Sequence, residues 1–185
     1  MKPAVFLDRD GTIIEDRGHL HSPEQISFIP SAIKALQELQ KTHLLFIVTH
    51  QSGIAKGLIT AKQAQSVNDA VVNRLAANQI AITAVYTCPH AREEGCACIK
   101  PNPHTLHEAA RDYDVDLSAS HVVGDHPHDY ELALNAGAHG IYVLTGHGRK
   151  HFDELPPETV VAKDIAEAAT IILTRNRPPN PQQET

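Results

Sequence analysis

Short apolar runs alternate with segments of helical periodicity along most of the chain. Runs of about four to eight apolar residues are typical of strands buried on both faces, and apolar residues at every third or fourth position are typical of helices. This pattern predicts strands at 4–7, 44–48, 82–87, 121–123, 140–144 and 159–161. It predicts helices at 31–41, 61–77, 103–113, 128–136 and 164–173. Thr60 and Gln63 have the spacing of a capping box, which supports a helix that begins at Ala61.

The alternation of strands and helices indicates an α/β fold. Because the strands are apolar on both faces, helices must cover both sides of a parallel sheet, which predicts a doubly wound, Rossmann-like sandwich. One domain is expected over residues 1–174, without an insertion long enough to form a separate cap domain. Residues 175–185 contain three prolines and almost nothing apolar, and they are expected to form a disordered C-terminal tail.

The composition narrows the class of protein. A chain of 185 residues with 42% hydrophobic and 21% charged residues suits one globular domain. A formal net charge of −6 argues against a broad surface for nucleic acid or an anionic membrane. No apolar run reaches membrane-spanning length and no signal-peptide pattern begins the chain, so a cytoplasmic protein is expected. The acidic charge and the lack of an apolar stripe favour a monomer.

The residues after the first predicted strand could carry chemistry, because ligands of doubly wound sheets bind beyond the carboxyl ends of the strands. Asp8 and Asp10 lie two positions apart in the run Asp8-Arg9-Asp10-Gly11-Thr12, so in an extended segment both point to one side. Together they could hold a divalent cation such as Mg²⁺. One carboxylate could also attack phosphorus while the other exchanges protons. Taken alone, the motif could equally be an Asp-rich turn.

Later strand ends carry complementary groups. The run Thr49-His50-Gln51-Ser52-Gly53 offers hydroxyl and amide groups suited to phosphate oxygens. Lys100 could balance phosphate charge, and Asp125 and Asp129 follow the fourth predicted strand. An acid pair, a Thr, a Lys and another acid after successive strands are the parts of a phosphoryl-transfer site.

A segment that we call the cysteine loop (residues 88–98) carries a potential metal site. Its ligands would be Cys88, His90, Cys96 and Cys98. Three thiolates and one imidazole suit tetrahedral Zn²⁺ of the structural type, because four protein ligands leave no position open for catalysis. Zinc would order a loop that has almost no apolar residues of its own and would place Lys100 just beyond it. Unligated cysteines are the alternative, because three cysteines make no disulfide framework.

Together, these strand-end motifs resemble the four motifs of the haloacid dehalogenase-like phosphatases, and the resemblance extends over residues 3–173. It implies that Asp8 is the nucleophile, which forms an aspartyl-phosphate, and that Asp10 is the general acid and base. It also implies that Mg²⁺ is held by Asp8, by Asp10 through its backbone carbonyl and by Asp125. Thr49 and Lys100 would stabilise the transferring phosphoryl group.

The cysteine loop and the segment Thr49–Gly57 are similar to the zinc-bearing branch of that family, which includes phosphatases of heptose bisphosphate and of histidinol phosphate. The segment favours the heptose side, and thus a small phosphorylated sugar substrate and a place in the synthesis of lipopolysaccharide core heptose. Histidinol phosphate or another small phosphomonoester is the alternative substrate. The resemblance assigns substrate binding to Asp16, Arg17, Gly18, His19, Thr49, His50, Gln51, Ser52, Ile99, Lys100 and His126.

Three positions depart from the family pattern, because His50 replaces an Asn, Ile99 an Arg and His126 a basic residue. The change at Ile99 matters most, since a guanidinium can bind a second phosphate through paired hydrogen bonds and Ile cannot. Either the substrate is a monophosphate, or another residue supplies the charge: Arg17, Lys56 or Arg149.

Two non-enzymatic hypotheses are less favoured. A phosphosugar-binding homologue without turnover would account for the departures, but the intact catalytic positions oppose it. A receiver-like phosphoacceptor domain also uses Asp, Thr and Lys, but the strands ending at Val48 and Thr87 offer no accepting Asp. Most histidines outside the cysteine loop are expected to be exposed or to cap helices, including His104, His107, His121 and His151.

Overall fold

The computed structural model describes residues 1–175, in which six parallel strands form one sheet. The strands are β1 (Ala4–Leu7), β2 (Leu44–His50), β3 (Ala84–Cys88), β4 (His121–Gly124), β5 (His139–Val143) and β6 (Val161–Ala162). Their order across the sheet is β3-β2-β1-β4-β5-β6. All six lie close to the predicted positions, and the sequence pattern therefore located the sheet.

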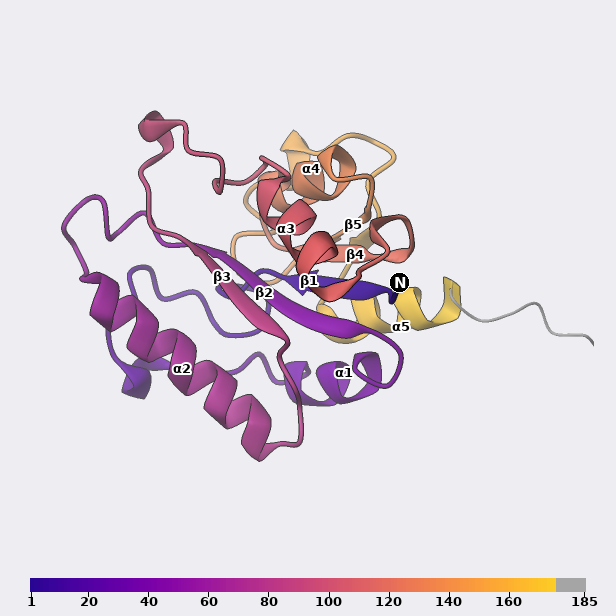
Figure 1. Cartoon of the computed structure of the whole chain (residues 1–185), viewed down its shortest axis with the longest axis horizontal. Helices are drawn as coiled ribbons and strands as arrows, with labels where there is room; N and C mark the ends of the chain where they lie inside the picture. Colours follow the sequence, from indigo (N-terminus) through magenta and orange to yellow (C-terminus); the bar gives the residue numbers. More distant parts are fainter. Residues whose placement is uncertain (176–185) are drawn as a thin grey trace, which may run out of the picture.

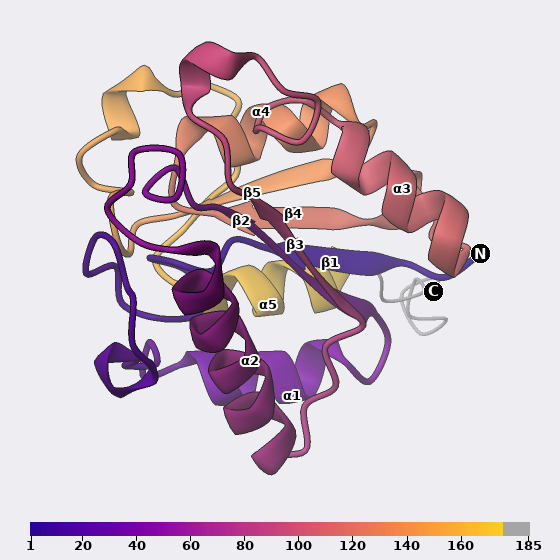
Figure 2. The same ribbon diagram turned by 60° about the vertical axis from the view of Figure 1, so that its left-hand side comes forward.

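Helices cover both faces of this sheet, as Figures 1 and 2 show. They are α1 (Ala32–Leu39), α2 (Ala61–Ala77), α3 (His104–Tyr113), α4 (Pro127–Asn135) and α5 (Ile165–Arg175). One apolar cluster joins α1, α2 and α5 to strand residues such as Val5 and Ile47. A second cluster joins α3 and α4 to the opposite face through Phe6 and Phe46, whose rings stack with centroids 5.0 Å apart. The α/β fold, doubly wound around a parallel sheet, is confirmed.

The chain reverses its direction across the sheet at β1. From β1 it proceeds to β2 and β3 on one side, and then returns to add β4, β5 and β6 on the other side. A doubly wound sheet opens a crevice at this point, beyond the carboxyl ends of the two strands that flank the reversal. Asp8 directly follows β1, and Asp125 directly follows β4, so both lie at this crevice.

A local sequence signal sets the start of α2, the longest helix in the described part of the chain. The Thr60 hydroxyl accepts a hydrogen bond from the backbone N–H of Gln63 at 3.1 Å, and the Gln63 side chain accepts one from the N–H of Thr60 at 2.8 Å. The predicted capping box is confirmed.

Helix α5 ends at Arg175, and the rest of the segment expected as a tail, 176–185, lies outside the described residues. Within the described part of the chain, no helix is both long and apolar enough to cross a membrane, and no separate cap domain is present.

One histidine differs from expectation. His121 begins β4 and is 1% exposed, and neither ring nitrogen has a hydrogen-bond partner among the described residues. It lies opposite His139 in the β4–β5 register, and the centroids of these two rings are 5.2 Å apart. The prediction that His121 is exposed or caps a helix was therefore wrong, because pairing with β5 places its ring inside the fold. Burial lowers the pKa of His121 to about 4.

Candidate active site

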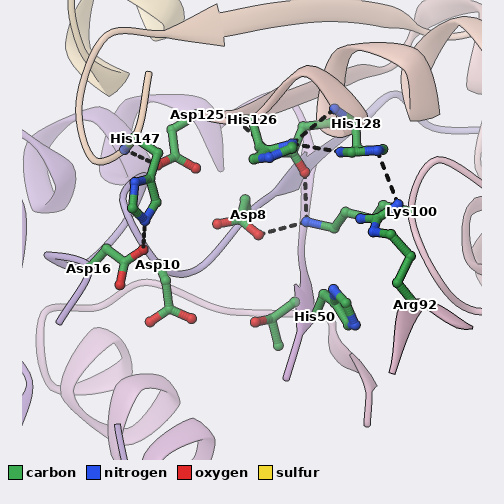
Figure 3. Close-up of a pocket in the computed structure, with 12 residues that line it drawn as sticks. Asp8, Asp10, Asp16, His50, Arg92, Lys100, Asp125, His126, His128 and His147 are labelled. Carbon is green, nitrogen blue, oxygen red and sulfur yellow. Dashed lines mark hydrogen bonds and ion pairs between the residues drawn. The ribbon is translucent and has the colours of Figure 1, made fainter. Parts of the chain in front are cut away.

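A cavity of about 200 Å³ lies beyond the carboxyl ends of β1, β2 and β4 (Figure 3). The residues predicted to follow these strands converge on it, and loops add further polar side chains. In Figure 3, Asp125 and His147 lie on one side of the cavity, with Arg92 and His128 on the other. The lining residues are Asp8, Asp10, Asp16, Thr49, His50, Arg92, Lys100, Asp125, His126, His128, Asp129 and His147.

Lys100 joins two carboxylates in the middle of the cavity. Its Nζ donates to Asp8 Oδ1 at 2.6 Å and to Asp129 Oδ1 at 2.7 Å. Burial by itself would lower the pKa of Lys100, but Asp129 and Asp8 raise it well above its usual value. Burial raises the pKa of Asp8 to about 6 against the opposing effect of Lys100. At neutral pH, Asp8 is therefore an ionised carboxylate beside a fixed cation.

A hydrogen-bond chain from α2 orients Asp10. The guanidinium of Arg9 is fully buried, and its Nη2 donates to Asp10 Oδ2 at 2.8 Å. Its Nη1 donates to Asn68 Oδ1 on α2 at 2.7 Å, and Gln51 Nε2 donates to Asp10 Oδ2 at 2.9 Å. Burial raises the pKa of Asp10, whereas Arg9 lowers it. These opposed effects suit a carboxyl group that both gives and takes a proton.

Glycine allows the chain to approach Asp125 closely. Gly11 has a φ of +81°, and a Cβ on it would lie 2.1 Å from Asp125 Oδ2. The same oxygen accepts the backbone N–H of His147 at 2.7 Å, which ties the loop after β5 to the site. No larger residue fits at position 11, so the glycine that follows Asp10 serves the packing around Asp125.

The described site holds more negative than positive charge. Burial, with further contributions from Asp8 and Asp129, raises the pKa of Asp125 to about 8. Carboxylates crowded in this way favour a divalent cation, which removes the mutual repulsion of their charges. Oxygen donors from Asp8, Asp10 and Asp125 match the ligands that Mg²⁺ prefers, so the residues present fit this ion.

The cysteine loop forms a second potential metal site. The ligand atoms of Cys88, His90, Cys96 and Cys98 all lie within 4.8 Å of one another. Neighbouring sulfur and nitrogen atoms are 3.4–3.8 Å apart. Ligands around tetrahedral Zn²⁺ are expected to lie about 3.6–3.8 Å from one another, given bond lengths of about 2.0–2.3 Å. The geometry of the cluster therefore fits zinc, as the spacing predicted.

Comparison with known proteins places the chain among phosphatases. Residues 97–168 match a family model described as HAD-hydrolase-like. The chain is 35% identical over 173 residues to the D-glycero-beta-D-manno-heptose-1,7-bisphosphate 7-phosphatase of Bordetella bronchiseptica, covering 91% of this chain and 97% of that protein. It is 37% identical over 171 residues to the enzyme of the same name from Escherichia coli K12, covering 88% and 86% of the two chains. The chain belongs to the haloacid dehalogenase-like phosphatases.

A solved structure supports the same assignment. The chain matches the D,D-heptose 1,7-bisphosphate phosphatase of B. bronchiseptica, crystallised with magnesium and phosphate, with a TM-score of 0.86. The match covers 95% of this chain and 99% of that one. Members of this phosphatase family are phosphoric monoester hydrolases, and the predicted family resemblance is confirmed.

In this haloacid dehalogenase-like phosphatase, most of the predicted substrate-binding residues border the site. A second cavity of about 240 Å³ is lined by Asp10, Asp16, Gly18, His19, His50, Gln51, Ser52 and His147. Arg17 lines neither cavity, because its guanidinium is exposed and pairs with Glu15 at 2.8 Å. Ile99 also lines neither, because its side chain is buried beside Pro101 in a separate groove. The assignment of Arg17 and Ile99 to substrate binding stays a prediction.

Several residues that border the site received no role from the sequence. Asp129 was noted only as an acid after the fourth predicted strand, and a Cβ on Gly124 would collide with its side chain. His147 lies in a glycine-rich segment whose role the sequence left open, and its Nε2 is 2.9 Å from Asp16 Oδ2. No sequence signal identified Arg92, because its partner His128 is 36 positions away. Arg9 is part of the motif that contains Asp8 and Asp10, but its contact with Asn68 spans 59 positions and was not foreseen.

Proposed function

We propose that this phosphatase removes the 7-phosphate of D-glycero-D-manno-heptose 1,7-bisphosphate, on the route to the heptose of the lipopolysaccharide core. The observation that carries the proposal is the combination of a Lys100-centred carboxylate cluster with near full-length similarity to two enzymes of that name. A small phosphorylated sugar is thus the partner of the site.

The proposed reaction begins with Asp8. Its ionised carboxylate attacks the phosphorus of the 7-phosphate, and the bond from phosphorus to the sugar oxygen breaks. Asp10 gives its proton to the leaving oxygen, which leaves an acyl phosphate, an aspartyl-phosphate, on Asp8. Asp10 then takes a proton from water, whose oxygen attacks the same phosphorus and releases free phosphate and Asp8. Lys100 and Thr49, both buried at the cavity wall, stabilise the charge of the phosphoryl group during both transfers.

Two metals complete the proposal. Asp8, Asp125 and the backbone carbonyl of Asp10 would hold Mg²⁺, which supplies positive charge opposite the phosphoryl oxygens. The four ligands of the cysteine loop would hold structural Zn²⁺. The loop reaches the catalytic groups through His50, whose Nε2–H donates to the backbone carbonyl of His90 at 2.8 Å. Zinc held by these residues would order the wall of the cavity and, with four protein ligands, would leave no position open for the reaction.

The sugar would occupy the second cavity. Asp16, His19, Gln51 and Ser52 line it and present groups that can bind hydroxyls. Gly18 lies in the same loop, and its N–H donates to Asp16 Oδ1 at 2.7 Å, which holds this carboxylate at the cavity edge. His126 lines the first cavity beside Asp125. A cytoplasmic location, a monomeric state and a disordered tail stay predictions.

The proposal is tested by phosphate release with Mg²⁺ from both anomers of heptose 1,7-bisphosphate, heptose 7-phosphate, fructose 1,6-bisphosphate and histidinol phosphate. We expect fastest release from one heptose bisphosphate anomer, and a loss of at least about a thousandfold in Asp8→Asn. Asp112→Asn, at an exposed aspartate on α3, is the matched control and should retain activity. Faster release from histidinol phosphate would overturn the substrate assignment, and full activity in Asp8→Asn would overturn the mechanism.

A further inference from the structure

Arg92 brings a positive charge to the catalytic cavity that no described carboxylate neutralises. It lies in a short 3₁₀ helix (Arg92–Glu94) of the cysteine loop, and its side chain reaches towards His128 (Figure 3). Lys100, the other cation that lines this cavity, is already shared between Asp8 and Asp129. Within residues 1–175, the guanidinium of Arg92 forms no ion pair. An anion that enters the cavity would therefore meet Arg92 as its available cation.

Two stacked histidines hold Arg92 in place. Arg92 Nη1 lies 3.0 Å from His128 Nε2, and His128 Nδ1 lies 2.7 Å from His126 Nδ1. The two rings stack with their centroids 4.6 Å apart. This contact joins the cysteine loop to the start of α4 and holds the guanidinium, which is exposed to solvent, at the edge of the cavity.

The hydrogen bonds assign the protons along this chain. Arginine only donates, so His128 Nε2 is an acceptor and the proton of the neutral ring is on Nδ1. His126 Nδ1 also accepts the backbone N–H of His128, at 3.3 Å, which requires a lone pair on this atom as well. The hydrogen bonds at His128 and at His126 thus both require neutral imidazole rings. Burial lowers the pKa of both histidines, to about 4 for His126, in keeping with neutral rings.

Most of the donor capacity of Arg92 remains available. A guanidinium carries five N–H groups, and in the described structure only one nitrogen of Arg92 has a partner. The unpaired N–H groups form a planar fork, a shape that matches two oxygens of one phosphate. None of the basic residues suggested by the sequence, Arg17, Lys56 and Arg149, lines this cavity.

We propose that Arg92, seated on His128, binds the phosphate of the substrate that is not hydrolysed, and so determines the preference for a sugar bisphosphate over a monophosphate. This inference rests on the proposed function. The reacting phosphate belongs beside Asp8 and Lys100, and a second dianion needs another cation in the same cavity. Arg92 meets this need. His128 is a positioning residue, which acts through Arg92 and does not contact the phosphate.

The test separates KM from kcat for heptose 1,7-bisphosphate and heptose 7-phosphate. In Arg92→Gln, we expect the ratio of the bisphosphate KM to the monophosphate KM to rise at least about tenfold, as for the loss of hydrogen bonds to a charged group. The kcat for the bisphosphate should stay within about threefold, because Arg92 does not touch the reacting phosphate. Arg92→Lys should restore part of the ratio, and His128→Leu should raise the ratio less than Arg92→Gln. Arg111→Gln, at an exposed arginine paired with Asp112 on α3, is the matched control.

Other outcomes overturn the inference. An equal rise in KM for both substrates would show that Arg92 serves the folding of the cysteine loop or binds the reacting phosphate. An unchanged ratio of the two KM values would show that Arg92 has no role in binding the second phosphate. A parent enzyme that releases no phosphate from either heptose compound overturns the proposed function instead. Calorimetric titration of Asp8→Asn with the bisphosphate, with and without Arg92→Gln, then tests Arg92 alone. At least tenfold tighter binding with Arg92 present supports the inference, and equal binding overturns it.

Discussion

The stabilisation of the fold by Mg²⁺ is expected to grow with pH. Asp125 has a pKa of about 8 in the fold, raised from 3.8 by burial and by its carboxylate neighbours. Without a metal, this group contributes full stability below about pH 4, and the contribution is lost as the pH rises towards 8. A cation bound by Asp125 must displace the proton at low pH but not at high pH. The free energy of Mg²⁺ binding therefore becomes more favourable as the pH rises.

The size of this effect follows from the number of protons displaced. Displacement of one proton changes the free energy of Mg²⁺ binding by about 1.4 kcal/mol per pH unit. This slope holds while the pH lies between the pKa of Asp125 with bound metal and its higher pKa without metal. Between about pH 5.5 and about pH 7.5, Mg²⁺ should gain about 2.7 kcal/mol, or about a hundredfold in apparent affinity. Asp8, with a pKa of about 6, adds to the slope below that pH. For a chain of this size the gain corresponds to about 5–10 °C in melting temperature.

The assay is thermal unfolding at several Mg²⁺ concentrations, at constant ionic strength and at both pH values. The quantity compared is the difference in melting temperature with and without Mg²⁺. This difference removes the contribution of buried histidines such as His121, which lowers stability as the pH falls by the same amount in both samples. Asp125→Asn removes the main titrating group, so its Mg²⁺ response should be weak and should depend less on pH than that of the parent, with Asp8 as the remaining titrating ligand. An equal Mg²⁺ stabilisation of the parent at both pH values would refute the reasoning, as would an undiminished response in Asp125→Asn.

Three further predictions concern other parts of the fold. Cys96→Ser should lower zinc content and bisphosphatase activity together, as measured by metal analysis and phosphate release; full activity without zinc would contradict the structural role. His121→Leu should stabilise the protein more at about pH 5 than at about pH 7, by about 2 kcal/mol, because the pKa of His121 is lowered from 6.5 to about 4 and its stability contribution is lost as the pH falls. Urea unfolding at both pH values measures the difference, and an equal gain at both would refute it. Asn68→Leu removes the acceptor that holds Arg9, so kcat should fall about tenfold at similar KM, because Asp10 loses its orientation. Steady-state kinetics would contradict this if only KM changed.

The sequence predicts well which polar side chains meet at the edge of the sheet, because these residues follow strands. Once Ala4–Leu7 and His121–Gly124 are assigned to one parallel sheet, their carboxyl ends must meet at one edge, and Asp8 and Asp125 must lie near each other. The ligands of the cysteine loop are predictable for a similar reason, since they are close along the chain. In both cases local spacing, or a single topological rule, is sufficient.

The remainder depends on packing between loops. Arg92 and His128 are 36 positions apart, and their contact depends on how the cysteine loop lies against the start of α4. The side chains of Arg17 and Ile99 have directions that no periodicity sets, and neither lines the two cavities. His121 is polar, but its burial follows from the register of β4 with β5, which the sequence pattern of one strand does not contain.

The residues at strand ends and the residues of the cysteine loop have different roles in the proposed site. Groups at strand ends are held by the sheet, and they are the ones that we propose perform the phosphoryl transfer. The cysteine loop supplies Arg92 and, just beyond it, Lys100, and it holds His50 through the carbonyl of His90. A substitution in this loop can thus change which phosphate ester is bound while the groups after β1 and β4 stay in place. Isoleucine at position 99 together with arginine at position 92 illustrates this, because the charge that we propose for a second phosphate comes from within the loop instead of from the position that follows it.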